Sequence, residues 1–80
     1  MSQLGASRDN APIALVRMSE LQQLTGLARP TVYKMLKRDP SFPRPVKLSD
    51  SEARNAPVAF VLSEVQAWIQ GRIRARELRA

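Results

Sequence analysis

A single glycine between two short apolar segments constrains the fold of this chain more than any other feature. Leu21 and Leu24 lie at helical spacing before Gly26. After it, a second stripe at helical spacing consists of Val32, Met35 and Leu36. Glycine readily adopts the left-handed conformation that commonly ends a helix, so Gly26 predicts a tight turn. Two short helices joined by such a turn predict a helix-turn-helix.

Local signals predict where these two helices begin and end. Ser19 to Gln22 read as a capping box, which predicts that the first helix begins after a Ser19 cap. Arg29-Pro30 predicts the start of the second helix, because proline is tolerated in a first turn. Asp39-Pro40 predicts its end, because the residue before a proline disfavours the α conformation.

The second half of the chain predicts a hairpin followed by a third helix. Residues 46–48 and 58–61 read as strands joined by the polar loop 49–56. A second capping box, Ser63 to Gln66, predicts a helix whose apolar face consists of Val65, Trp68, Ile69 and Ile73. The apolar run 13–16 is either a brief extended segment or chain packed under the core. The expected fold is mainly α with a small β-hairpin: a winged helix-turn-helix with a two-stranded wing and a C-terminal helix.

Composition narrows the functions open to this fold. With 80 residues the chain allows one small domain, which we expect over residues 13–80 after a disordered tail over residues 1–12. Thirteen Lys+Arg against seven Asp+Glu give a net charge of +6, which favours a polyanionic partner. The chain contains no cysteine and no histidine, so thiolate zinc sites, disulfides and histidine general bases are excluded.

Other features lead us to expect neither catalysis nor a membrane segment. The seven acids are scattered, and no nucleophile–base pair of Cys and His can form. We expect no catalytic residue, metal, cofactor or small-molecule ligand. Apolar runs are only a few residues long, and the N-terminus has no basic region followed by an apolar stretch. We therefore expect a cytoplasmic protein.

The second helix has the composition of a DNA-reading helix. It contains four cations and no acid. The candidate DNA-binding residues are Arg29, Pro30, Thr31, Tyr33, Lys34, Lys37 and Arg38. N-terminal residues of the second helix reach base edges in helix-turn-helix proteins, so Arg29 is the candidate for a bidentate guanine contact. Thr31 can meet a phosphate or a thymine methyl. Four residues hold the DNA backbone and set the register: Tyr33, Lys34, Lys37 and Arg38.

Each of these assignments has a plainer alternative. The cations can form the solvated face of an ordinary helical hairpin, and Tyr33 can lie half-buried over that hairpin. Trp68 could be a stacking platform for an unpaired base, but its helical spacing favours a core anchor.

The predicted hairpin supplies a second, more tentative group of DNA-binding residues. These are Lys47, Arg54 and Asn55. Asp50 and Glu52 lie in the same loop and weaken its attraction for phosphates. The hairpin could instead only cover the core.

Four segments of the chain resemble the AlpA family of small prophage-encoded regulators. They are LVRMSEL at 15–21, LTGLARPTVYK at 24–34, FPRPVKL at 42–48 and SEVQAWI at 63–69. The resemblance covers about four-fifths of the chain and implies a winged helix-turn-helix that binds double-stranded DNA and controls prophage or mobile-element genes. Some relatives are excisionases, which help an integrase to excise the element. The resemblance thus implies an integrase partner and a location on the bacterial nucleoid. Because one small module offers only about 600–1,000 Å² of interface, we also expect further copies on adjacent DNA sites.

The sequence departs from the family pattern in three places. Ala28 stands where the second helix usually has a Ser or Thr cap, and Pro30 replaces a small polar residue. The loop 49–56 is longer and more acidic than the short basic turn expected there. The sequence does not separate a transcription factor from an excisionase, since both use this module. A protein-interaction module that binds a phage or host partner without reading DNA is the remaining alternative.

Overall fold

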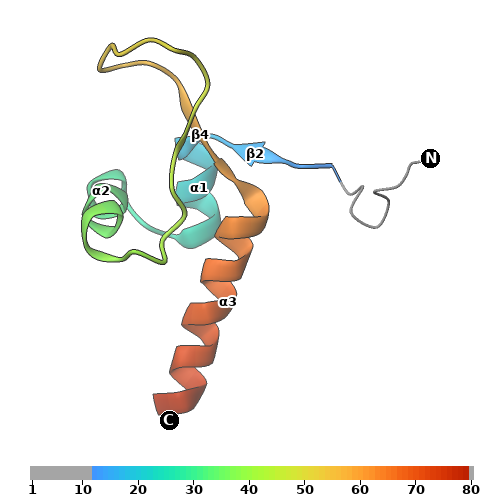
Figure 1. The fold of residues 1–80 in the computed structure, drawn as a ribbon. Coiled ribbons are helices and arrows are strands. Elements are labelled where there is room, and N and C mark those ends of the chain that lie inside the picture. Colours follow the sequence, from blue (N-terminus) through green and yellow to red (C-terminus); the bar gives the residue numbers. More distant parts are fainter. Residues whose placement is uncertain (1–11, 80) are drawn as a thin grey trace, which may run out of the picture.

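The computed structural model describes residues 12–79, in which three helices pack around a small sheet (Figure 1). In chain order the elements are β2 Leu15–Val16, α1 Met18–Thr25, α2 Arg29–Arg38, β3 Val46–Lys47, β4 Val58–Val61 and α3 Leu62–Arg79. The tail predicted over residues 1–12 lies outside the described residues, apart from Pro12.

The turn between α1 and α2 forms as predicted. Gly26 has φ 76°, in the left-handed region, and its N–H donates to the Gln22 carbonyl at 2.7 Å. The Thr25 hydroxyl donates to the Leu21 carbonyl at 2.8 Å and accepts the Leu27 N–H at 3.2 Å. These bonds satisfy the backbone groups that the end of a helix leaves free. The chain is therefore redirected into α2 within three residues.

Both predicted capping boxes are wrong. The N-cap of α1 is Arg17, which makes no side-chain capping bond, so Ser19 lies inside the first turn. α3 begins at Leu62, so Ser63 lies within it. The cause is tertiary in the second case: Leu62 directly follows β4, and its N–H donates to the Ala14 carbonyl at 2.8 Å. The first backbone N–H of α3 is thus satisfied by the segment that pairs with β4, so the helix follows the strand directly and has no separate cap.

The sheet has one more strand than the hairpin alone would provide. β4 lies at its centre and pairs antiparallel with β3 and with β2, in the order β2-β4-β3. The apolar run 13–16, which the sequence left open, contains β2, and Val16 pairs with Phe60. This pairing ties the segment before α1 to the base of the wing, which is formed by β3, β4 and the loop 48–57.

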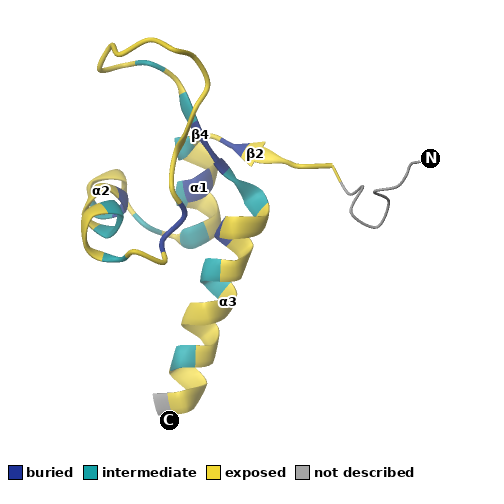
Figure 2. Ribbon diagram, in the orientation of Figure 1, coloured by how far each residue is buried: buried dark blue, intermediate teal, exposed yellow. Residues whose placement is uncertain are grey.

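The core lies where α1, α2 and the start of α3 meet β4 (Figure 2). Its buried members are Val16, Leu21, Val32, Phe42, Phe60 and Val65. Trp68 packs against this cluster, with its ring centroid 4.9 Å from that of Phe42 in an edge-to-face arrangement. The core-anchor interpretation of Trp68 is therefore confirmed. Helix pair, winged sheet and C-terminal helix together form the predicted winged helix-turn-helix.

Only the first half of α3 packs against the core. Val65 is fully buried, whereas Ile73 is 38% exposed and Leu78 is 86% exposed. Figure 1 shows the C-terminal half of α3 extending away from the other elements, on the side opposite the wing. The apolar face predicted from spacing thus continues beyond the point where the small core can cover it.

Candidate nucleic-acid interface

α2 buries one face and presents a cationic one. Val32 is fully buried, and Met35 and Leu36 pack against the core. Six residues of α2 have exposed side chains: Arg29, Pro30, Tyr33, Lys34, Lys37 and Arg38. α2 contains no acid, and Lys37 and Arg38 lie in its last turn, where the helix dipole favours positive charge. The structure therefore brings six of the seven residues predicted on this helix to its accessible side.

The first turn of α2 pairs an arginine with an aromatic ring. The Arg29 guanidinium carbon lies 5.9 Å from the centroid of the Tyr33 ring, at a cation–π distance. Tyr33 is 46% exposed, so the phenol is accessible beside Arg29. Thr31, the seventh predicted residue, is only half-buried and remains partly accessible. Arg29 and Tyr33 thus lie together on the outer face, one turn apart.

The C-terminal end of α2 is held by an arginine that the sequence reasoning did not single out. Arg44 donates from Nη1 to the Leu36 carbonyl at 2.9 Å and from Nη2 to the Asp39 carbonyl at 2.9 Å. Its Nε donates to the Phe42 carbonyl at 3.0 Å. A basic residue just past a helix end is the signal that could have identified it, because such side chains bond the last carbonyls. Arg44 is thereby engaged with backbone and ties the connector after α2 to the end of that helix.

Asp39 connects the same end of α2 to α3. Its carboxylate accepts hydrogen bonds from the Ser41 hydroxyl, from the Ser41 N–H at 2.9 Å and from the Trp68 indole N–H at 3.1 Å. The Ser41 hydroxyl, then Trp68 and the Ser41 N–H, lower the pKa of Asp39 below its ordinary value, and the charge of Arg72 adds to this. Asp39 therefore serves as an anchor within the fold and is ionised at neutral pH.

The wing places its predicted residues in two different settings. Arg54 and Asn55 occupy the corner of a turn closed by the Ala56 N–H, which donates to the Ala53 carbonyl at 3.0 Å. Both side chains are exposed. Lys47, by contrast, donates to Glu52 at 2.9 Å in an exposed ion pair. In Figure 1 the wing loop extends over the side on which α2 lies.

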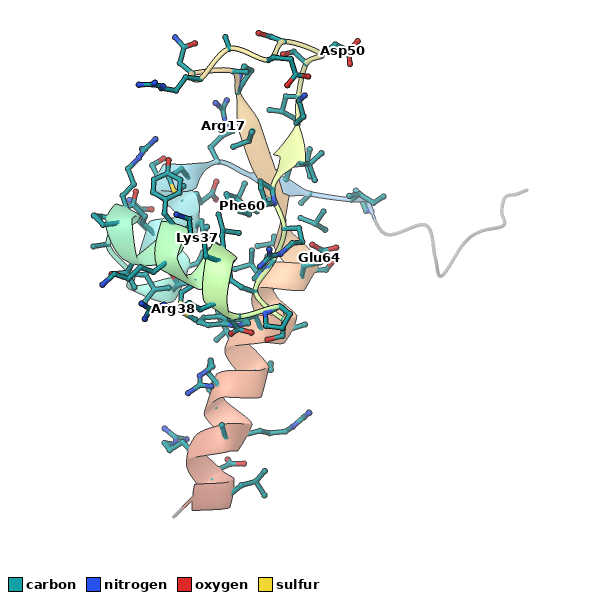
Figure 3. The ribbon with its side chains drawn as sticks, turned by 60° about the vertical axis from the view of Figure 1, so that its left-hand side comes forward. Arg17, Lys37, Arg38, Asp50, Phe60 and Glu64 are labelled. Atoms are coloured by element: carbon teal, nitrogen blue, oxygen red, sulfur yellow. The ribbon has the colours of Figure 1, made fainter. Side chains whose placement is uncertain are left out.

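Arg17 is a further cation on this side that the sequence reasoning missed. Its side chain is exposed, and its Nε–H donates to the Val58 carbonyl at 2.9 Å. Figure 3 shows it between α2 and the wing strands. No local signal distinguishes this arginine, because its position depends on the pairing of β2 with β4, 41 residues further along the chain.

The described part of α3 carries further cations and borders a hollow. Arg72, Arg74 and Arg76 are exposed along α3. A hollow of about 560 Å³ lies between the connector after α2 and α3, where Asp39 and Trp68 make the contacts described above. Within residues 12–79, no group of three or more His, Cys, Asp or Glu side chains could hold a metal ion. No helix in that range is long and apolar enough to cross a membrane.

Comparison with known proteins agrees with this architecture. A family model described as the prophage CP4-57 regulatory protein (AlpA) matches residues 14–73, which include the helix pair, the sheet and the packed part of α3. An uncharacterized protein of enterobacteria phage P4, ORF88, is 37% identical over 62 residues. The matched segment covers 78% of this chain but 64% of the phage protein, less than two thirds of its length. No solved structure matches the chain significantly. The family model covers most of the chain, including all the elements of the fold up to residue 73. The protein therefore belongs to the AlpA family of prophage regulatory proteins.

Proposed function

We propose that this protein is a sequence-specific, double-stranded DNA-binding regulator of a prophage or similar mobile element. The observation that carries the proposal is the exposed, acid-free face of α2. Four cations on one short helix give a strong local positive potential, and the helix-turn-helix arrangement is one that inserts its second helix into the major groove. The family's regulatory description supports the same conclusion.

Within this proposal the residues of α2 have distinct roles. Arg29, at the N-terminus of α2, makes the bidentate contact to guanine, because that position reaches furthest into the groove. Thr31 meets a phosphate or a thymine methyl. Four residues hold the DNA backbone and set the register of the helix: Tyr33, Lys34, Lys37 and Arg38.

The wing makes the secondary contacts. Arg54 and Asn55 are at the turn and have free access to flanking DNA. Lys47 must exchange Glu52 for a phosphate, which costs little because exposed ion pairs are weak. We therefore rank Arg54 and Asn55 above Lys47 as wing contacts.

The small size of the module implies that several copies act together on DNA. A single module covers about 600–1,000 Å² of DNA-facing surface, so useful specificity requires two or more copies on adjacent sites. As an excisionase the protein coats and bends attachment-site DNA alongside the integrase, and as a transcription regulator it acts at a promoter. Either role places it on the nucleoid in the bacterial cytoplasm.

Genome-wide footprinting of the tagged protein in its host tests this proposal and separates the two roles. Clustered sites beside an integrase gene or attachment site support the excisionase role. One peak over a promoter far from any integrase gene supports a transcription regulator. An absence of peaks, together with no gel shift of any duplex at low salt, contradicts DNA binding and favours a module that binds a protein partner instead.

A further inference from the structure

We infer that Arg17 contacts a DNA phosphate in the angle between α2 and the wing, and that it joins the contacts of these two elements into one continuous interface. The inference rests on the proposed function. Arg17 belongs to neither element: it lies between β2 and α1, as the N-cap of α1.

The first observation is that the Arg17 guanidinium is already positioned. Its Nε–H donates to the Val58 carbonyl at 2.9 Å, although the side chain is exposed. An exposed arginine ordinarily samples many rotamers, and fixing it on a ligand costs conformational entropy. The bond to Val58 removes part of that cost before any ligand arrives. The fork of N–H groups at the end of the side chain remains available for an anion.

The second observation is the absence of a competing carboxylate. Among the residues that the structure describes, Arg17 forms no ion pair with Asp or Glu. Lys47 differs, since it is engaged by Glu52. Val58 lies opposite Lys47 in the β3–β4 register, so Arg17 and Lys47 come to the wing base from either side of β4, and of these two only Lys47 is paired with an acid among the described residues. Within residues 12–79, Arg17 therefore has no acidic partner at the wing base.

The third observation is location. Figure 3 shows Arg17 between the wing strands and α2, from which Lys37 and Arg38 extend. When a helix lies in one groove and a wing reaches the next, a strand of phosphates passes between them. A guanidinium in that angle faces this strand of phosphates.

A purely structural role predicts different behaviour. The bond between Arg17 and Val58 links the segment before α1 to β4, so removing it could weaken the fold without affecting DNA. Arg17→Gln distinguishes these roles, because its amide keeps a donor for the Val58 carbonyl while the charge is lost. Arg17→Lys keeps the charge and loses the planar fork.

The experiment measures dissociation constants against KCl concentration for the full chain and its variants. The probes are a duplex containing a footprinted site and a scrambled duplex of equal length. We expect Arg17→Gln to weaken binding to both duplexes about tenfold. Its log–log salt slope should be less steep than that of the wild type by about 0.9, the contribution of one phosphate. Arg17→Lys should keep the slope and lose less affinity.

Arg74→Ala is the matched control, because it removes the same charge from the part of α3 that extends away from the wing. It should leave the slope unchanged. Thermal unfolding of each variant establishes that binding is measured on folded protein. A wild-type slope and affinity for folded Arg17→Gln overturns the inference and leaves the proposed function intact. Failure of the wild type to bind either duplex instead overturns the proposed function.

Discussion

Arg29 and Tyr33 form a unit on the outer face of α2. The ring lies under the guanidinium at 5.9 Å, a contact worth about 0.5–1 kcal/mol at an exposed site. This contact limits the directions in which Arg29 can extend and leaves its N–H edge available. A planar guanidinium held in this way suits directional recognition of a base better than the point charge of a lysine such as Lys34 or Lys37 does.

Replacing Arg29 should therefore affect specificity. We expect Arg29→Ala to lose about 1–3 kcal/mol of binding free energy on the cognate duplex and little on unrelated DNA. Lys37→Ala is the comparison: it should weaken both equally, because it removes only a phosphate contact. Titration of both variants against both duplexes checks the difference. Equal losses for Arg29→Ala on the two duplexes would reassign Arg29 to the DNA backbone.

Asp39 makes stability depend on pH in a defined direction. Hydrogen bonds from Ser41 and Trp68 lower the pKa of the folded carboxyl below the ordinary value of 3.8. The unfolded chain therefore binds this proton more readily than the folded chain does. The stabilisation is complete above pH 3.8 and is lost as pH falls from there through the lower folded pKa.

Urea unfolding at a series of pH values tests this dependence. Wild type should be more stable than Asp39→Asn at neutral pH, and the difference should shrink as pH falls below the ordinary range for aspartate. Other carboxyl groups titrate in both proteins, so the comparison isolates Asp39. A difference that stays constant down to pH 2 would show that the charge of Asp39 contributes nothing.

At the scale of elements, α2 is secured unequally at its two ends. Two bonds from Arg44, to the Leu36 and Asp39 carbonyls, and the bond from Trp68 to Asp39 hold its C-terminus. Its N-cap, Ala28, has the extended backbone of a cap, with φ −74° and ψ 157°, but no side chain that can bond a free N–H. The weakly secured end is the one that carries Arg29.

Restoring a cap should stabilise α2. We expect Ala28→Ser to raise the free energy of unfolding by about 1 kcal/mol, because the hydroxyl can accept an N–H of the first turn. Ala53→Ser, in the exposed wing loop, is the matched control and should change little. Thermal and urea unfolding measure both. If both variants behave alike, the geometry at position 28 does not permit a capping bond.

At the scale of the whole molecule, the positive net charge is the property that most affects binding to DNA. The chain carries +6, and in the described region the acids Asp39 and Glu52 are engaged in bonds within the protein. Exposed cations occur on α2 and on the wing, on the side proposed to face DNA. Such a distribution gives any complex with DNA a large electrostatic component, released as counterions.

Binding to duplex DNA should accordingly weaken steeply with salt. About five phosphate contacts give a log–log slope near −4.5, so affinity should fall several hundredfold between 50 and 200 mM KCl. Fluorescence anisotropy on a labelled duplex measures this slope. A slope near zero would mean that the cations of α2 do not face phosphates.

Signals within a few residues of one another were sufficient to predict much of the fold and the exposed face of α2. Gly26 ended α1, Pro30 marked the first turn of α2, and residues 58–61 formed β4 within their predicted bounds. Periodicity on α2 separated the buried Val32 from the exposed cations. In each case the cause acts within one or two turns of chain, through backbone conformation or side-chain spacing.

Contacts between distant segments decided the rest. The first residue of α3, the third strand and the position of Arg17 depend on groups that folding brings together from distant parts of the chain. The clearest case is Arg17: its neighbours in sequence give no indication of Val58, because β2 must first pair with β4. Spacing along one helix can therefore identify an exposed face, whereas a surface shared by several elements exists only after the sheet has joined them.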